Sequence, residues 1–458
     1  MQQAVLAETE LLLKDRASLQ DDVDFSSERN GFPLAQLRYK TPLRENQEEP
    51  KRASPPQYEV ADIFRAYGAK YRAGHALSPQ QGRAMFDIER CRTEEFGTHW
   101  DVCDMCGHSE KAHCSCHNRH CPKCHGVAAR IWLAQRLKDL LPVPYYHMVF
   151  TLPDEQLHPL YLYNQEVIYN LLFESAAQTL LIFGRDPRWL GARMGFFGVL
   201  HTWGQTLWLH PHVHFVVPGG GINEDGEWVS ATHQSTFLFP VKALSKRFRK
   251  LFTEGLAEAY EAGRLVLPPD WKYLERSKAF NKWLKILGQK EFVVFSKPPL
   301  GGAEGVLRYV GRYTHRVAIS NQRILSIDDG QIRFTYKDYK EREEHGAYEW
   351  KEMTLSAEEF IRRFLNHILP KGFHKIRHYG FLRNGKKALL DQIRWYLFLE
   401  EGIAANFGEE QDAQFSDGIL CPVCRIGRLL PVVVNHRFGA IVIRNESYLR
   451  MQELWNTS

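Results

Sequence analysis

Long hydrophobic runs are missing from this sequence of 458 residues. No stretch approaches the roughly 18 consecutive apolar residues that identify a membrane-spanning helix. The N-terminus carries Glu8 and Glu10 where a secretory signal peptide requires positive charge. The sequence also lacks an internal repeat and a glycine-rich phosphate-binding loop of the Walker or Rossmann kind. We therefore expect a soluble, cytoplasmic protein that is not secreted.

A large excess of charge of one sign is also missing. The chain has 59 Lys and Arg residues against 54 Asp and Glu residues, which gives a formal net charge of +5 with neutral histidines. Apolar residues make up 44% and charged residues 25%. These ordinary values exclude wholesale disorder, a collagen-like repeat and a coiled-coil rod. At about 100 to 200 residues per domain, the length predicts two to four units, including one small accessory module.

Cysteine is scarce but clustered. Only nine cysteines occur, and seven of them fall within the 34 residues from Cys91 to Cys124. In a chain without a signal peptide, such a cluster indicates metal ligation rather than disulfides. Two CxxC pairs lie close to a zinc-ribbon spacing, and further cysteines and histidines could complete a second tetrahedral site. The eight expected ligands of two structural zinc ions are Cys91, His99, Cys103, Cys106, Cys116, His120, Cys121 and Cys124.

The pairing of these eight ligands stays open, because a cross-braced arrangement and two sequential sites would use the same residues. Cys114 is the spare cysteine of the cluster. A separate pair near the C-terminus, Cys421 and Cys424, is only half a site, to which His436 could contribute. A chance cluster or a redox centre is the alternative, and the two correctly spaced pairs argue against it.

The order of predicted elements indicates an α+β fold. Residues 1–57 have the composition of a loosely ordered arm, a zinc-binding domain follows over 58–130, a larger domain over 140–340, and a basic C-terminal region over 341–458. In the larger domain, strands expected in hairpins favour a mainly antiparallel sheet flanked by helices. We expect strands at 145–152, 194–201, 206–217, 291–296 and 324–336, and helices at 58–73, 127–141, 160–183, 241–262, 271–287 and 304–313.

Three histidines alternate along one of these strands. His210, His212 and His214 share one face, because successive side chains of a strand point to opposite sides. Two imidazoles at positions i and i+2 of a rigid strand form half of a coordination shell for a divalent cation. The alternative is a set of histidines that simply satisfy each other within a core.

Two tyrosines follow at helical spacing. Tyr309 and Tyr313 would lie one turn apart on the same face of a helix. A phenol attacks phosphorus only when a metal and cations stabilise the developing charge. Arg312, Arg316 and Lys297 are near in sequence and could supply that charge. The alternative is a pair of core aromatic residues.

The histidine strand followed by a tyrosine pair resembles the HUH endonucleases. Further motifs between about Cys91 and Arg383 make the sequence similar to the rolling-circle transposases of the insertion-sequence ninety-one type. They are the cluster ending Asn118-Arg119-His120-Cys121-Pro122-Lys123-Cys124, the strand Phe150-Thr151-Leu152-Pro153, the segment Leu200-His201-Thr202-Trp203-Gly204-Gln205, the stretch from Tyr309 to Ser320 and the stretch from Gly372 to Phe381.

The resemblance implies a fold and a chemistry. The fold is an HUH domain with a ferredoxin- or RRM-like antiparallel sheet. His212 and His214 would ligate Mg²⁺ or Mn²⁺, with His147 as the preferred third ligand and Gln205 or His210 as alternatives. Tyr309 and Tyr313 would attack single-stranded DNA, leaving a 5′-phosphotyrosine link and a free 3′-hydroxyl. The partners implied are single-stranded DNA at the element ends and at the target, in the nucleoid.

Two other functional readings stay open. One is a plasmid replication initiator or relaxase that uses the same chemistry. The other is a zinc-dependent DNA-binding protein with an inactive nuclease centre, which the presence of both histidines and both tyrosines argues against. A non-haem oxygenase is disfavoured because no carboxylate accompanies the histidine motif as a facial ligand.

A basic segment without acidic residues runs from Ile361 to Lys387. Phe373, Tyr379 and Phe381 are interleaved with its basic residues, and aromatic rings can stack on unpaired bases. An ordinary solvated basic surface is the alternative. The residues expected to contact DNA are Lys297, Arg312, Arg316, Lys371, Lys375 and Arg377.

Overall fold

A computed structural model describes seven segments of the chain, residues 56–124, 140–231, 238–300, 317–342, 348–399, 419–436 and 439–442. The expected helices at 127–141 and 304–313 therefore lie wholly or almost wholly outside the described residues, as does nearly all of the expected N-terminal arm.

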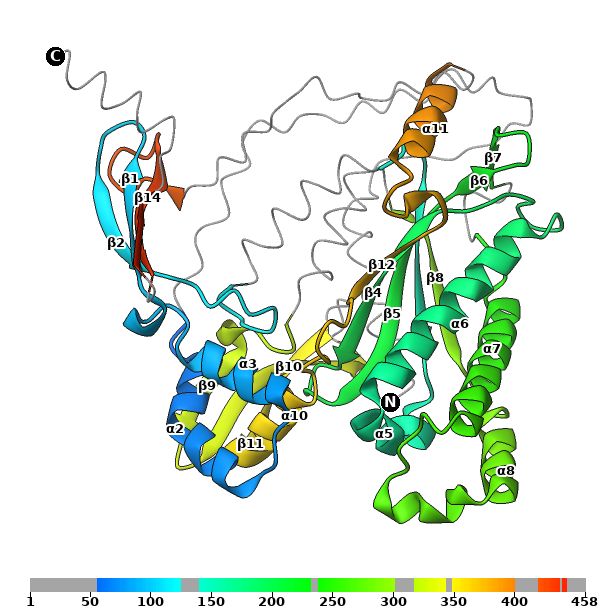
Figure 1. The fold of residues 1–458 in the computed structure, drawn as a ribbon, viewed down its shortest axis with the longest axis horizontal. Coiled ribbons are helices and arrows are strands. Elements are labelled where there is room, and N and C mark those ends of the chain that lie inside the picture. The colour runs from blue at the N-terminus through cyan, green and yellow to red at the C-terminus, as the bar shows by residue number, and fades with distance from the viewer. Residues whose placement is uncertain are drawn as a thin grey trace.

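The central sheet has five antiparallel strands in the order β12-β4-β5-β3-β8 (Figure 1). The prediction of an antiparallel sheet flanked by helices is confirmed, and the expected hairpin is the pair β4 and β5. The strands are β3 (Tyr145–Thr151), β4 (Phe196–Trp203), β5 (Leu209–Pro218), β8 (Val293–Leu300) and β12 (Ile376–Tyr379).

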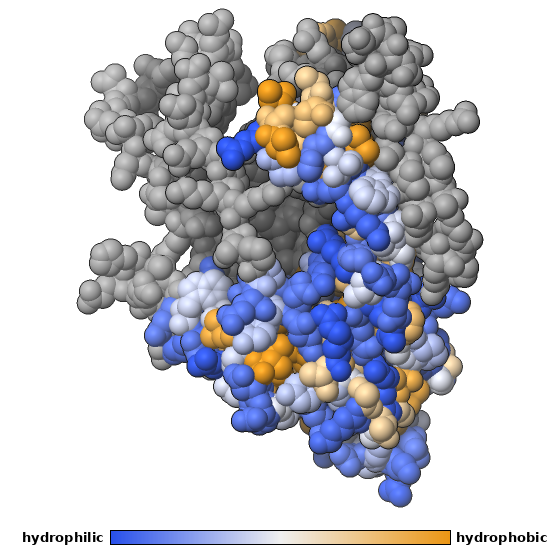
Figure 2. Space-filling model, turned by 90° about the vertical axis from the view of Figure 1, so that its left-hand side faces the viewer, coloured by the Kyte–Doolittle hydropathy of each residue, from blue (hydrophilic) through white to orange (hydrophobic). Residues whose placement is uncertain are grey.

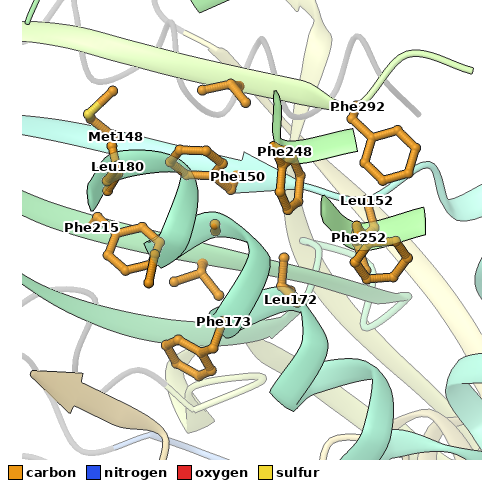
Figure 3. Packing of buried hydrophobic residues seen from close by; sticks show 14 of the residues in the cluster. Met148, Phe150, Leu152, Leu172, Phe173, Leu180, Phe215, Phe248, Phe252 and Phe292 are labelled. Atoms are coloured by element: carbon orange, nitrogen blue, oxygen red, sulfur yellow. The ribbon is translucent and has the colours of Figure 1, made fainter. Parts of the chain in front are cut away.

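Helices cover one face of this sheet. Phe150 of β3 and Phe215 of β5 lie in van der Waals contact edge to face, and Phe248 packs on Phe150 from the helical layer (Figure 3). Burying rings of this size supplies most of the driving force for a layer of this kind. The elements of the layer are α5 (Asp154–Tyr163), α6 (Gln165–Arg185), α7 (Val241–Glu261), the 3₁₀ helix η4 (Pro269–Glu275) and α8 (Ser277–Leu287).

Among the described residues, one helix is long and apolar enough to cross a membrane, namely α6. It packs on α7 and on the sheet, and 61% of its apolar window is buried within the protein. The single helix expected over 160–183 is in fact α5 and α6, which meet at Asn164. The Asn164 side chain donates to the carbonyls of Leu160 and Val266 and accepts from the Val266 amide, which holds the corner.

A second core joins the N-terminal helices to a three-stranded sheet. Phe64 of α2 meets Phe364 of α10 edge to face, and the Val60 amide donates to Asn321. The expected hairpin turns at Asp329 and Gly330, both of which have positive φ angles, as a tight hairpin turn requires. The elements are α2 (Val60–Gly74), α3 (Pro79–Glu89), η5 (Asn321–Arg323), β9 (Ile324–Asp328), β10 (Gln331–Arg342), β11 (Tyr348–Ser356) and α10 (Ala357–Leu365).

A third sheet combines residues from both ends of the sequence. β1 pairs antiparallel with β2 on one side and with β14, more than 300 residues later, on the other (Figure 1). The sheet comprises β1 (Thr98–Cys103), β2 (Ser109–His113), β13 (Ile419–Leu420), β14 (Arg428–His436) and β15 (Gly439–Val442). The remaining elements are η3 (Glu94–Phe96), β6 (Gly220–Ile222), β7 (Trp228–Ser230), η6 (Gly380–Leu382) and α11 (Lys387–Leu399).

Segments that are distant in sequence thus share layers. β12 comes from the region expected as a basic C-terminal domain, yet it pairs with β4 in the central sheet. β11 and α10, from the same region, belong to the core that holds α2 and α3. On the face seen in Figure 2, the described surface is mainly hydrophilic with smaller hydrophobic patches between.

Candidate functional site

Four histidines lie on the face of the central sheet that is turned away from α6 and α7. Val213 and Phe215 of β5 point into the core beneath the helices, so His212 and His214 point to the other face. His201 of β4 is paired directly with His212, and His147 of β3 lies on the same side. All four are buried. Buried polar side chains of this kind must hydrogen-bond to one another or bind an ion.

The regular register of the hairpin puts His201 on this face, because the ladder from Phe197 to His201 is unbroken and ends with His201 opposite His212. Two residue steps on β4, from His201 to Trp203, are opposed by three steps on β5, from His212 to Leu209. The extra residue on β5 falls in the stretch that contains Pro211, which cannot donate a ladder hydrogen bond and is tolerated at a bulge. The shift therefore changes the pairing of Trp203 and the turn, not that of His201.

Three of these imidazoles converge. The nearest nitrogens of His201, His212 and His214 lie within 4.8 Å of one another. The ring centroids are 4.5 Å apart for His201 and His214 and 4.8 Å apart for His212 and His214. His201 belongs to the motif Leu200 to Gln205 but is not among the metal ligands predicted from the sequence. Its selection would have required the register of the β4–β5 hairpin.

The hydrogen bond of His212 sets its tautomer. Nδ1 of His212 lies 2.8 Å from the carbonyl oxygen of His210. A carbonyl only accepts, so Nδ1 carries the proton and the Nε2 lone pair is the one that can bind a metal. Burial lowers the pKa of His212 to about 3, and the charge of His210 acts in the same direction. The ring is therefore neutral at physiological pH, which is the state a metal ligand needs.

His147, expected as the third ligand, occupies a different position. Its Nε2 lies 2.8 Å from Nδ1 of His214, and the two rings stack with centroids 5.1 Å apart. If Nε2 of His214 binds a metal, its Nδ1 proton is donated to His147. His147 then acts as the partner that orients a ligand, a role common around metal sites. Burial, and secondarily the charges of Lys297 and His212, hold the pKa of His147 well below its ordinary value.

The other two alternatives for the third ligand are His210 and Gln205, and His210 is not among the three converging histidines. His210 faces the Asp154 carboxylate through Nδ1, because the irregularity at Pro211 separates it from the row of His212. Tyr161 donates to the second carboxylate oxygen of Asp154 at 3.3 Å. The Gln205 backbone carbonyl accepts from Arg323, which places this residue in the turn rather than on the sheet face.

The turn between β4 and β5 is held by the second core. Arg323, Arg363 and His367 donate to three successive carbonyls, those of Gln205, Thr206 and Leu207. His367 also accepts from the Thr202 hydroxyl at 3.2 Å. The hairpin that carries His201, His212 and His214 is therefore clamped at its tip as well as paired along its length.

The expected nucleophiles cannot be placed. Tyr309 and Tyr313, with Arg312 and Arg316, lie outside the described residues. Lys297 is described: it is buried on β8 and is paired with His147 across the sheet. A cationic side chain therefore lies on the strand next to the histidine row.

The basic segment is less exposed than its composition suggests. Lys371 is exposed, but the Arg377 guanidinium packs over the rings of Phe173 and Phe373 and donates to Asn170. Lys375 lies over Trp203, and burial, with a smaller effect of the Arg119 charge, lowers its pKa to about 7. The aromatic residues expected to stack on bases, Phe373, Tyr379 and Phe381, instead contribute to hydrophobic cores, because β12 and η6 close one edge of the central sheet.

The cysteines form two groups of four. In the first, Cys91, Cys116, Cys121 and Cys124 bring their sulfur atoms within 4.8 Å of one another. The Sγ atoms of Cys91 and Cys124 are 3.5 Å apart, and those of Cys116 and Cys124 are 3.6 Å apart. A tetrahedral zinc with Zn–S bonds of about 2.3 Å has sulfurs about 3.8 Å apart.

The second group joins Cys103 and Cys106 to Cys421 and Cys424. The grouping therefore differs from the sequence expectation, in which the C-terminal pair was half of a separate site. His99 and His120 belong to neither group: His99 lies beside Cys114, and Nε2 of His120 accepts from the Leu369 amide. Cysteines from the C-terminus take the places that these histidines were expected to fill, because β14 pairs with β1.

Comparisons with known proteins agree with this layout. A transposase zinc-binding domain of the IS91 type matches residues 63–152, and a putative transposase family, Y2_Tnp, matches residues 195–388. A putative transposase, y4qJ, from Sinorhizobium fredii is 46% identical over 388 residues, which cover 82% of this chain and 95% of that protein. This chain belongs to the IS91 family of transposases.

A second member of the IS91 family is the transposase for insertion sequence element IS801 from Pseudomonas savastanoi pv. phaseolicola. It is 33% identical over 301 residues, which cover 64% of this chain and 68% of the relative. No solved structure matches the chain. As a transposase, the protein acts on DNA, and the matched zinc-binding region contains all four cysteines of the first group.

Proposed function

We propose that this IS91-family transposase cuts and rejoins single-stranded DNA by HUH chemistry, mobilising its element by a rolling-circle-like route. The observation that carries the proposal is the convergence of His201, His212 and His214 on one buried face of the sheet. The five antiparallel strands with helices on one face provide the arrangement expected of an HUH domain. The motif match between about Cys91 and Arg383 supports the same assignment.

The three histidines would hold the divalent cation, Mg²⁺ or Mn²⁺. Bound there, the cation supplies charge neutralisation at the scissile phosphate. Imidazole nitrogens suit softer divalent ions, whereas Mg²⁺ prefers oxygen ligands. Of the two ions, a set of three neutral imidazoles therefore favours Mn²⁺ over Mg²⁺. His147 orients His214 through the 2.8 Å contact between their rings.

Tyr309 and Tyr313 are the proposed nucleophiles. The phenol oxygen forms a bond to phosphorus while the bond from phosphorus to the 3′-oxygen breaks, so the 5′ end is linked to tyrosine and the 3′ end leaves as a hydroxyl. Attack by a 3′-hydroxyl on the phosphotyrosine reverses these steps, and one phosphodiester replaces another without an external energy source. Two tyrosines allow one strand to be held while a second is cut.

Lys297 is proposed to assist at the phosphate. It is buried on β8 opposite His147, on the strand that borders the histidine row. A preorganised cation in such a setting stabilises charge that develops on phosphate oxygens. We propose that Arg312 and Arg316, near the tyrosines in sequence, contact the same strand, and that exposed Lys371 contacts DNA further away. Lys375 and Arg377 contribute less, because both pack against aromatic side chains.

A covalent adduct assay tests the proposal. The protein, freed of loosely bound metal but with its zinc retained, is incubated with Mn²⁺ and single-stranded DNA from the element's end. We expect an adduct that survives denaturation, that is absent without Mn²⁺ and that is lost in His212→Ala. The control is His113→Ala, because His113 is exposed on β2 and outside the histidine group. An undiminished adduct in the double variant Tyr309→Phe/Tyr313→Phe would remove both tyrosines from the mechanism.

The same assay separates the alternatives. A replication initiator or relaxase would form the adduct but would not join the element's end to a target strand, so the strand-transfer product decides between them. A DNA-binding protein with an inactive centre would retain the DNA without forming any adduct. The intact histidine group argues against this second alternative.

A further inference from the structure

We propose that Cys103, Cys106, Cys421 and Cys424 bind a second zinc ion, which clasps the C-terminal strands onto the N-terminal zinc-binding domain. Cys421 and Cys424 lie outside both matched family regions, which cover residues 63–152 and 195–388. The proposal concerns this cysteine group alone and does not depend on the chemistry of the histidine site.

The sulfur geometry fits zinc and not disulfides. The Sγ atoms of Cys103 and Cys424 are 3.7 Å apart, as are those of Cys106 and Cys421. An edge of a tetrahedral zinc–thiolate site is about 3.8 Å, whereas a disulfide bond is about 2.05 Å. The four sulfurs lie within 4.8 Å of one another, with two of the cysteines buried. One ion can therefore contact all four.

The two halves of the site repeat the same turn. The Cys103 amide donates to the His108 carbonyl at 2.8 Å, and the Cys421 amide donates to the Gly427 carbonyl at 2.8 Å. In each turn, the amide four residues after the first cysteine donates back to the carbonyl of that cysteine, at 3.1 Å and 3.0 Å. Backbone amides also point at sulfur, since Cys106 donates to Cys103 and Gly427 donates to Cys424. Such donors stabilise thiolates.

In both turns, the residue that follows the second cysteine has a positive φ angle. Gly107 has a φ angle of 72° in the first turn, and Arg425 has a φ angle of 56° in the second. A non-glycine residue in this region costs about 1–2 kcal/mol, so surrounding contacts must hold Arg425 there. Four converging thiolates around one ion would supply such a constraint.

The two turns fit closely against each other. The Asp104 amide donates to the Arg428 carbonyl at 3.0 Å, and the Arg428 amide donates to the Asp104 carboxylate at 2.7 Å. At Gly427, a Cβ atom would lie 2.6 Å from Sγ of Cys103. Only glycine allows this approach. The antiparallel pairing of β14 with β1 continues from this contact, with Cys103 opposite Leu429.

The four-cysteine site, called the clasp below, connects two segments that are far apart in the sequence. Cys106 and Cys421 are 315 residues apart, and the whole central sheet lies between them. Cys421 and Cys424 are synthesised more than 300 residues after Cys106, so this site can fill only after the residues of the central sheet have been made. Loss of its ion would free the C-terminal strands and leave β1 with an unpaired edge.

Zinc content tests the proposal directly. We expect two zinc ions per full-length chain and one in the full-length variant Cys421→Ser/Cys424→Ser. The control Cys114→Ser should retain two, because Cys114 lies in neither four-cysteine group. Two ions in the double variant, or one in the wild type, would overturn the clasp.

Alkylation of the wild-type protein avoids any folding defect of the variant. In the zinc-loaded protein, the four clasp cysteines should resist alkylation, and stepwise chelation should expose all four together, as mass spectrometry of the labelled peptides would show. Labelling of Cys421 and Cys424 while Cys103 and Cys106 stay protected contradicts the proposal. A mass lower by two hydrogens for each linked pair in the untreated protein would identify disulfides instead and would also overturn it.

Discussion

Replacing His147 and His201 in turn distinguishes a metal ligand from the residue that orients one. In His147→Ala, all three converging nitrogens remain, but Nδ1 of His214 loses the partner that lies 2.8 Å away. Removal of such a partner typically weakens metal binding about 10- to 100-fold, or about 1.4 to 2.7 kcal/mol. In His201→Ala, one nitrogen of the group is lost outright, so we expect a loss beyond about 100-fold.

The assay is titration of the zinc-loaded protein with Mn²⁺, followed by electron paramagnetic resonance of the free ion. His147→Gln serves as the rescue variant, because its amide oxygen can accept the proton that His214 donates. We expect it to bind Mn²⁺ more tightly than His147→Ala. If His147→Ala loses more affinity than His201→Ala, the roles of the two residues are exchanged and the ligand assignment fails.

Three further expectations follow from other contacts. Gly380→Ala should lower the free energy of unfolding by about 1–3 kcal/mol more than Gly385→Ala, as denaturant titration would measure. Both glycines have positive φ angles, but only a Cβ atom at position 380 would lie against the Met194 carbonyl. Equal losses would contradict the packing of η6. Hydrogen bonds from two arginines lower the pKa of Glu359 from 4.5 to about 2, so its stabilisation is present above pH 4.5 and is lost as the pH falls towards 2. Glu359→Gln should therefore cost about 1 kcal/mol at pH 7 after solvent screening and should flatten acid unfolding between those values; an unchanged acid profile would argue against the ion pairs. Mn²⁺ should support DNA cleavage at lower concentration than Mg²⁺, and a preference for Mg²⁺ would speak against a site made of imidazoles alone.

Periodic features of the sequence were sufficient to predict four of the five strands of the central sheet, β3, β4, β5 and β8. The alternation in β5 identified His212 and His214 as neighbours on one face, and the apolar spacing located α2 and α7 within a few residues. These features follow from the local spacing of apolar and polar side chains. That spacing has the period of a strand or of a helix whichever element the segment packs against.

Features that depend on register or on distant pairing were not predicted. The selection of His201 over His147 depends on the register of the β4–β5 hairpin, which pairs His201 directly with His212. The pairing of Cys421 with the N-terminal cysteines depends on β14, which no local pattern connects to β1. The aromatic residues near Arg377 were expected at the surface because their sequence neighbours are basic, whereas strand pairing of β12 buries them.

The most direct test of the mechanism is to identify the residue that carries the DNA. After reaction with Mn²⁺ and single-stranded DNA, the adduct is digested with protease and nuclease, and the modified peptide is sequenced by mass spectrometry. We expect a nucleotide attached through its 5′-phosphate to Tyr309 or Tyr313. A nucleotide on any other side chain, or cleavage that leaves a free 5′-phosphate with no protein attached at any time, would contradict the mechanism.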